Sequence, residues 1–299
     1  MTGLPDGVSS RPLVLADAPA VVEVMAAFEM ATIGSVVITE ADIIGDWNRP
    51  SFDLDAGTIG VFEGDRLLGY AEVSGPARGD ACVHPEETGR GIGTFLAHWM
   101  QDTARAQGQS EIGMPVPEGS PGETLLRDLG YHQRWTSWVL ELPAGRDIPQ
   151  LPLPAGYGLR IAEAEDVEAT YHVIEDAFLE WSVRDKQPYD DWRAQVVERP
   201  GFEPWNLQLV TGPDREVVGG VHVVLDPDGT GFVSKVAVRA DQRGKGLAKA
   251  LLAAAFAAAR EVGNGRSELS TDSRTGALDL YLGLGMEISS TWINYGIAV

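Results

Sequence analysis

Two glycine-rich turns, each opening a long helix, constrain this chain more than any other feature. Residues 243–248 read Arg-Gly-Lys-Gly-Leu-Ala; they follow the apolar run Phe232–Val238 and precede a helix predicted to reach about Val262. A spacing of 155 residues leads back to residues 88–93, Thr-Gly-Arg-Gly-Ile-Gly, in the same setting. Such a turn directs several backbone N–H groups toward one point at a helix N-terminus, which suits a phosphate. The pattern predicts two copies of one anion-binding unit.

The order of the predicted elements also repeats between the two halves. Short strands are expected at Leu13–Leu15 and Leu159–Ile161, and helices follow them at Ala18–Met30 and Asp166–Leu179. Each half then continues with a strand pair, the strand before the glycine turn and the helix after it. Strands that alternate with helices in this way indicate an α/β fold.

A proline-rich segment separates the repeats. Residues 143–156 hold four prolines and two glycines and show little amphipathic pattern, which is typical of an extended linker. A chain of 299 residues is long enough for two cores of about 150 residues each. We therefore expect an N-terminal domain over residues 1–146, a linker over 147–156 and a C-terminal domain over 157–299.

Composition narrows the classes of partner and compartment. The net charge of −21 disfavours nucleic acid and anionic membranes and favours cationic small molecules. The most apolar stretch, Ala250–Ala259, is far shorter than the roughly 20 residues that span a bilayer. The single cysteine, Cys82, allows no intrachain disulfide and is expected to be a small buried hydrophobe. We expect a cytoplasmic protein without a bound metal; the oligomeric state stays open.

The second turn and a tyrosine segment after it carry a resemblance to a known family. Arg243-x-x-Gly246-x-Ala248 and Leu280-Tyr281-x-x-Leu284-Gly285-Met286 resemble two signatures of the GNAT superfamily of N-acetyltransferases. The resemblance covers both halves, is sharper in the second, and extends to the tandem type of mycothiol-synthase-like acetyltransferases. It implies two tandem GNAT-like domains, each a mixed, mostly antiparallel twisted sheet flanked by helices, and acetyl-CoA as substrate.

The resemblance also implies which residues bind acetyl-CoA and which one supplies a proton. The strand before the turn would offer backbone groups to the pantetheine arm, and the turn would hold the pyrophosphate. Tyr281 would protonate or stabilise the departing thiolate, because an unperturbed phenol with a pKa of about 10 keeps its proton at neutral pH. The expected acetyl-CoA residues are Val236, Ala237, Val238, Arg243, Gly244, Lys245, Gly246, Leu247 and Ala248.

The general base is not evident from the sequence. Some relatives use a glutamate on the strand before the glycine turn, but Gly231–Val238 contains no carboxylate here. The nearest replacements are His222, on the neighbouring predicted strand, and Glu180, at the end of the second domain's first helix. A histidine with a pKa near 6.5 can act as a base at neutral pH. Deprotonation through water stays as an equal alternative.

The first half is expected to be degenerate. Thr88 stands where the second turn has Arg243, and Leu126 stands at the position of Tyr281, so no phenol is available there. We expect a non-catalytic domain that still permits weak CoA binding. The possible second CoA site comprises Val83, Gly89, Arg90, Gly91, Ile92 and Gly93.

These expectations define an enzyme that moves the acetyl group of acetyl-CoA directly to a primary amine of a small molecule. The acceptor is expected to contact the segment from Trp181 to Trp205, which carries five aromatic residues among acidic ones: Trp181, Tyr189, Trp192, Phe202 and Trp205. An anchoring surface between domains is the alternative for these aromatics. Two further functions stay open: a CoA-binding regulatory or scaffold module without turnover, and a protein N-acetyltransferase.

Overall fold

The computed structural model describes residues 3–149, 151–182 and 184–299 and divides the chain into two compact units. Unit 1 comprises the chain through Ser137 together with Ser290–Val299, and unit 2 comprises Trp138–Ser289. Both units are built from sheets flanked by helices, so the α/β fold class is confirmed.

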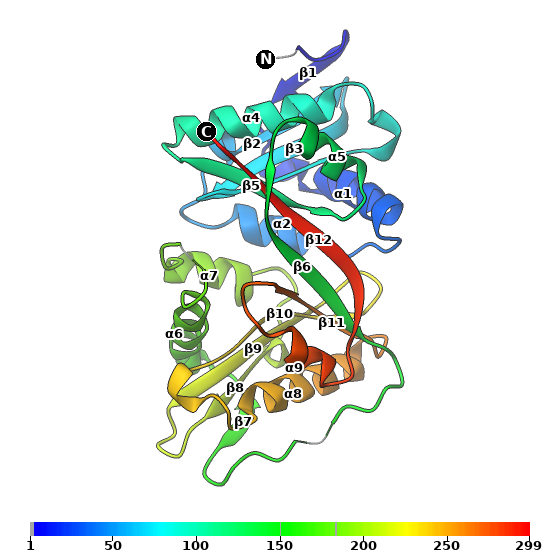
Figure 1. Ribbon diagram of the computed structural model, residues 1–299. Helices are drawn as coiled ribbons and strands as arrows, with labels where there is room; N and C mark the ends of the chain where they lie inside the picture. Colours follow the sequence, from blue (N-terminus) through cyan, green and yellow to red (C-terminus); the bar gives the residue numbers. More distant parts are fainter. Residues whose placement is uncertain (1–2, 150, 183) are drawn as a thin grey trace. The chain divides into compact units, whose positions relative to one another are not determined.

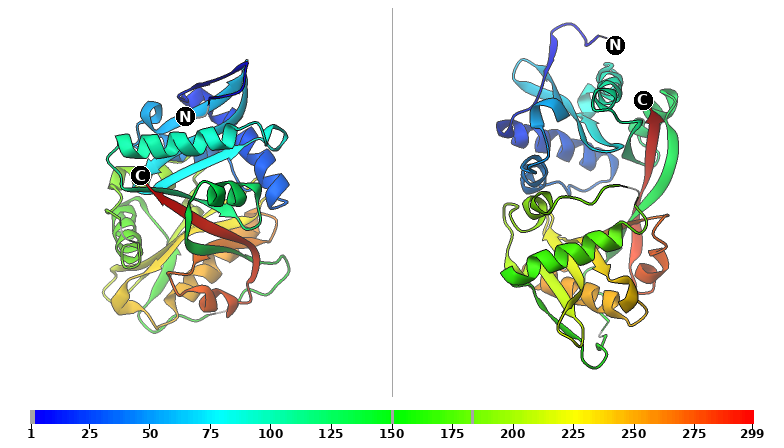
Figure 2. Two further views of the ribbon diagram at one scale, coloured as in Figure 1. Left: turned by 45° about the horizontal axis from the view of Figure 1, so that its top comes forward. Right: turned by 90° about the vertical axis from the view of Figure 1, so that its left-hand side faces the viewer.

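Unit 1 is built on the antiparallel sheet β1-β2-β3-β4 (Figure 1). Helices α1 and α4 cover opposite faces of this sheet (Figure 2), and each face has its own apolar core. The N-terminal elements are β1 (Val8–Arg11), α1 (Ala18–Thr32), α2 (Glu40–Trp47), α3 (Leu54–Gly57), β2 (Thr58–Glu63), β3 (Arg66–Gly75) and β4 (Arg78–Val83). After them come α4 (Ile92–Ala106), β5 (Glu111–Pro117), α5 (Pro121–Asp128) and β6 (His132–Leu142).

Unit 2 repeats this order around strands arranged β6-β11-β10-β9-β8-β7 (Figure 1). Strands β7 to β10 pair antiparallel, whereas β10 and β11 pair in parallel. The first elements are β7 (Gly158–Ile161), α6 (Val167–Phe178), α7 (Tyr189–Val196), β8 (Leu207–Thr211), β9 (Val217–Leu225) and β10 (Gly231–Val238). They are followed by α8 (Leu247–Val262), β11 (Ser267–Asp272), α9 (Leu278–Leu282) and β12 (Glu287–Ala298).

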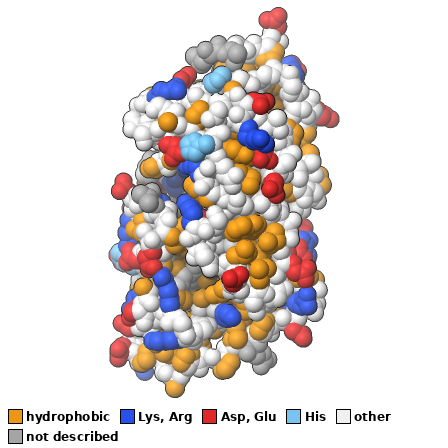
Figure 3. Space-filling model, viewed as in Figure 1, with side chains coloured by type: hydrophobic (Ala, Val, Ile, Leu, Met, Phe, Trp, Pro, Cys, Tyr) orange, Lys and Arg blue, Asp and Glu red, His pale blue; other side chains and the backbone are white. Residues whose placement is uncertain are grey.

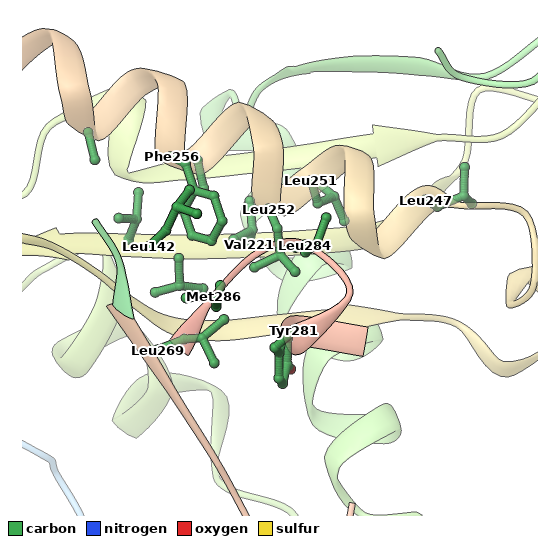
Figure 4. Close-up of a cluster of buried hydrophobic side chains, with 14 of the residues drawn as sticks. Leu142, Val221, Leu247, Leu251, Leu252, Phe256, Leu269, Tyr281, Leu284 and Met286 are labelled. Atoms are coloured by element: carbon green, nitrogen blue, oxygen red, sulfur yellow. The ribbon is translucent and has the colours of Figure 1, made fainter. Parts of the chain in front are cut away.

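Two packed faces hold unit 2 together. The apolar face of α8 packs against Val221 and Val223 of β9, and Phe256 lies within this cluster (Figure 4). On the other face, Ile174 of α6 packs with Leu207 and Ala237. Glycine permits this close approach: a Cβ at Gly220 would lie 2.7 Å from a methyl group of Thr170 on α6. The sheet that carries the candidate site is therefore tightly covered on both faces.

The last strand of each repeat divides differently from the expected domains. Residues 138–142 of β6 belong to unit 2, and residues 290–299, which include most of β12, belong to unit 1. Leu140 and Leu142 fill the core of unit 2, while Ile293 and Tyr295 fill the core of unit 1. We expected the domain boundary at the proline-rich segment. Instead, each of these two strands belongs to the unit in whose core its apolar side chains are buried.

Most predicted elements lie where they were expected, with one clear exception. The strand predicted at Leu13–Leu15 is wrong: the first strand is β1, and Leu15–Asp17 form a single turn of 3-10 helix. Leu13 is 1% exposed, so its apolar character reflects burial beside the strand rather than strand pairing. Residues 147–149 and 151–156 contain no helix or strand, and the remaining linker position, Gln150, lies outside the described residues.

Candidate active site

The glycine turn of unit 2 adopts the geometry that an anion-binding loop requires. Gly244 and Gly246 have φ values of +76° and +80°, in the left-handed region that favours glycine. A Cβ at either position would meet no atom within 4 Å, so backbone conformation rather than space requires glycine here. Gly246 caps α8, and no side chain caps this helix. The first N–H groups of α8 are thus open to a ligand, beside the positive end of the helix dipole.

Both cations of this turn contact other side chains. The Lys245 ammonium donates to the Tyr157 hydroxyl at 2.7 Å and to Oε1 of Gln242 at 2.6 Å. The Arg243 guanidinium forms a two-pronged ion pair with Glu180 and donates from Nε to the carbonyl of Val238 at 3.1 Å. The structure therefore brings two predicted site residues together, but as an ion pair beside the turn. Glu180 neutralises Arg243, so its carboxylate is engaged with a cation.

The strand that leads into the turn separates from its parallel neighbour. Pairing between β10 and β11 covers only three positions and ends at Val233 opposite Leu269, although β11 continues to Asp272. On its other side β10 stays paired with β9 as far as Val238 opposite Gly219. The backbone edge of Val236–Val238 that faces β11 thus lies beyond the last β10–β11 pair. That edge can accept and donate hydrogen bonds to an extended ligand arm.

Tyr281 lies on α9, which follows β11. Its ring belongs to the apolar cluster around α8 and is 8% exposed; in Figure 4 it lies at the margin of that cluster, away from Phe256. Burial raises the pKa of its phenol above the usual value of 10. No described residue forms a hydrogen bond with its hydroxyl. A protonated phenol with a free hydroxyl in an apolar setting is suited to donating a proton.

The two proposed bases differ sharply in environment. His222 on β9 is 2% exposed, and burial, reinforced by Lys235 and Arg199, lowers the pKa of its imidazole to about 3. The ring is therefore neutral and weakly basic at neutral pH, which disfavours it as a proton acceptor. Its Nδ1 lies 2.6 Å from the hydroxyl of Ser234 on β10. Sequence reasoning missed Ser234, although it is the only hydroxyl residue in the strand Gly231–Val238.

The turn of unit 1 has the same backbone but different charges. Gly89 and Gly91 have φ values of +79° and +83°, and α4 also begins without a side-chain cap. Arg90, which corresponds to Lys245, pairs with the carboxylates of Glu87 and Glu63. Acidic side chains thus offset the cation where unit 2 has the neutral Gln242.

Most other residues of the possible second CoA site, in unit 1, are packed against the core of that unit. Ile92 is 1% exposed, Val83 packs against the same core, and a Cβ at Gly93 would lie 2.9 Å from Leu125. Leu126, at the position that corresponds to Tyr281, is 3% exposed in the apolar core. Unit 1 therefore offers no phenol at that position.

The aromatic segment expected to contact the acceptor serves two purposes. Trp192 is fully buried and packs edge-on against Tyr171, so it belongs to the core beneath α6 and α7. Trp181 instead lies against the guanidinium of Arg274, 5.2 Å from its ring centre. Arg274 is in the loop between β11 and α9, which leads to Tyr281. Of the five aromatics, Trp181 has a contact with the segment that carries the candidate acid.

The distribution of charge, the metal-ligating side chains and the helix lengths bear on the expected partners. On the face in Figure 3, acidic and basic side chains are interspersed, so the net charge of −21 does not form one acidic patch there. Over the part of the chain that the structure describes, no three metal-ligating side chains gather into a site, and no helix is long and apolar enough to cross a membrane.

Comparison with known proteins gives consistent matches. The model of the acetyltransferase (GNAT) family matches residues 167–286. A mycothiol acetyltransferase of Salinispora arenicola is 32% identical over 241 residues, which is 77% of each chain. Another, from Thermobispora bispora, is 30% identical over 235 residues, covering 75% of this chain and 78% of the relative.

Solved structures agree on the fold. A GCN5-related N-acetyltransferase from Sphaerobacter thermophilus is 26% identical, with a TM-score of 0.74 over 99% of this chain and 97% of its own. A tandem GNAT protein from the clavulanic acid biosynthesis pathway is 17% identical, with a TM-score of 0.72 over 97% and 98% of the two chains. The second match supports the fold alone.

Proposed function

The chain belongs to the acetyltransferase (GNAT) family and is an acetyltransferase that uses acetyl-CoA, and from this premise we propose that unit 2 acetylates a primary amine of a small molecule. The observation that carries the proposal is the conjunction of three features in one unit: an uncapped helix after a left-handed glycine turn, a separated strand pair, and a phenol without a partner among the described residues.

The glycine turn is the proposed binding site for the pyrophosphate of acetyl-CoA. Backbone N–H groups of Leu247 and Ala248 would donate to the phosphate oxygens, and Lys245 would add positive charge. The open edge of Val236–Val238 would bind the pantetheine arm through backbone groups, because the side chains of Ala237 and Val238 are buried. The thioester would then lie between β10 and β11, on the side from which α9 presents Tyr281.

The proposed reaction is a direct transfer without an acyl-enzyme. The neutral amine attacks the thioester carbonyl, a C–N bond forms, and the C–S bond breaks. The nitrogen loses one proton to water, and the departing thiolate takes a proton from Tyr281, which solvent replaces. A phenol whose pKa is raised stays protonated through the neutral range and can make this donation in each cycle.

The names of the curated relatives indicate which acceptor to test first. The two mycothiol acetyltransferases support an amine precursor of mycothiol, with amino sugars and polyamines next. Unit 1 is proposed to be non-catalytic, since Arg90 is neutralised and Leu126 occupies the phenol position.

A thiol-release assay with acetyl-CoA and this series of amines tests the proposal. We expect release of CoA that depends on one amine and saturates with it, and a product heavier by one acetyl group in the mass spectrum. Tight binding of acetyl-CoA with no release in the presence of any amine would instead indicate a binding module without turnover. Acetylation of peptides but of no small amine would redirect the proposal to a protein substrate.

A further inference from the structure

Ser234 occupies a singular position in β10. The register between β10 and β9 shifts between Val233 and Lys235, so Ser234 is the extra residue of a β-bulge. It is also the first residue beyond the last β10–β11 pair, Val233 opposite Leu269. Its side chain is exposed, whereas Val233 and Ala237 are buried. A single hydroxyl is thus presented at the point where the two strands begin to separate.

A buried ring holds this hydroxyl. Nδ1 of His222 lies 2.6 Å from Oγ of Ser234, and the same Oγ lies 3.4 Å from the His222 carbonyl. The imidazole is buried, and its low pKa keeps it neutral. The serine donates its proton to Nδ1 when the ring is protonated at Nε2, and to the His222 carbonyl when the ring is protonated at Nδ1. In both cases Oγ keeps a lone pair for a further partner, and toward that partner Ser234 can only accept a hydrogen bond.

The residues around Ser234 and His222 exclude a role for His222 as a base that becomes positively charged. Lys235 pairs across from His222 in the strand register, and both Lys235 and Arg199 disfavour a second positive charge on the ring. No carboxylate lies in the strand Gly231–Val238 to take a proton from an ammonium. The site therefore favours an amine that arrives neutral and needs orientation rather than deprotonation.

We propose that Ser234 contacts the acceptor amine: its Oγ accepts a hydrogen bond from the amine N–H and aims the nitrogen lone pair at the thioester carbonyl. His222 is a positioning residue that acts through Ser234. This inference rests on the function proposed above. It places the pair Ser234 and His222 where the amine binds, and there a neutral hydroxyl rather than a carboxylate accepts the hydrogen bond.

Three serine variants test the inference. Ser234→Ala removes the acceptor, Ser234→Thr keeps a hydroxyl and suits a strand, and Ser289→Ala removes an exposed hydroxyl that bonds the carbonyl of Val139 elsewhere in unit 2. We expect Ser234→Ala to lower kcat/KM for the amine about 10-fold, the loss of one hydrogen bond to a substrate. Ser234→Thr should recover most of it, and Ser289→Ala should match the wild type.

Readouts other than turnover separate contact from a structural effect. The melting temperature and the Kd for acetyl-CoA should stay unchanged in Ser234→Ala. Wild-type kcat/KM in Ser234→Ala, or an equal loss in acetyl-CoA affinity, would overturn the assignment while leaving the proposed function intact. If the wild-type enzyme releases no CoA with any amine, the proposed function fails and this inference fails with it.

Discussion

The carboxylate of Glu180 accepts two hydrogen bonds from the guanidinium of Arg243, at 2.5 Å from Nη1 and 2.7 Å from Nη2. Glu180 follows the first helix of unit 2, and Arg243 opens its glycine turn, so the pair ties the loop after α6 to the proposed phosphate site. A carboxylate held beside this turn competes with an incoming phosphate for the same cation.

Removing that carboxylate charge should favour acetyl-CoA. Glu180→Gln is expected to lower the Kd for acetyl-CoA by about 3-fold, because both partners are partly exposed and such pairs contribute less than about 1 kcal/mol. Isothermal titration calorimetry at low ionic strength measures the change. Glu198→Gln, which breaks the exposed pair with Arg193 instead, is the control. Weaker binding in Glu180→Gln would mean that the pair organises the turn rather than competing for it.

Lys245 should contribute to acetyl-CoA binding, and its counterpart in unit 1 should not. Lys245→Ala removes a cation that neutral partners hold at the turn, so the Kd should rise about 10-fold, with a smaller effect at high salt. Arg90→Ala is the matched control, because Glu87 and Glu63 already neutralise that side chain. Equal effects of the two substitutions would place CoA at both turns.

Loss of the phenol proton should slow the chemical step alone. Tyr281→Phe keeps the ring in its apolar cluster and is expected to lower kcat by roughly 10²–10⁴-fold, typical of losing an acid–base group. Steady-state kinetics measures kcat, and the Kd for acetyl-CoA and the melting temperature serve as controls. Unchanged turnover would remove Tyr281 from the mechanism.

Unit 1 contains a buried carboxyl that should make its stability depend on pH. Burial raises the pKa of Glu72 to about 7, with Asp46 and Asp80 adding to the shift, although Nε1 of Trp47 donates to its carboxylate at 3.1 Å. The folded state thus binds more protons than the unfolded state between about pH 4.5 and 7, and its free energy of unfolding falls as the pH rises through that window. The loss is about 3 kcal/mol in total.

The substitution Glu72→Gln should flatten this dependence. Urea unfolding at pH 5 and pH 8 should show a smaller difference in the variant than in the wild type, with the gain in stability at pH 8. The exposed Glu118→Gln serves as the control and should leave the wild-type difference unchanged. If the free energy of unfolding of Glu72→Gln differs between pH 5 and pH 8 as much as that of the wild type, other titratable groups cause the pH dependence.

Local patterns predicted the architecture well because local physics determines it. The left-handed glycines at 244 and 246, the apolar α8 and the strand Gly231–Val238 all follow from conformation and periodicity along the chain. The family resemblance is confirmed by the comparisons. The acid–base and acetyl-CoA residues stay predictions, and the variants above test them.

What the sequence could not show depends on partners distant along the chain. Arg243 and Glu180 are 63 positions apart, and only the folded loop after α6 reveals that they neutralise each other. His222 has an ordinary pKa until β10 and the residues around it bury the ring. Ser234 is distinguished by a β-bulge and by the end of the β10–β11 pairing. The mostly apolar sequence of β10 indicates neither feature.

The reassignment of the final strands has a practical consequence for dissecting this enzyme. A gene cut within residues 147–156 would yield one fragment lacking the strand that carries Ile293 and Tyr295, and another lacking Leu140 and Leu142. Each fragment would expose an unfilled apolar groove and aggregate when produced alone. Co-production should rescue both, since each fragment carries the piece that completes the other. The presence of both repeats together is then a condition of folding, whatever each repeat contributes to catalysis.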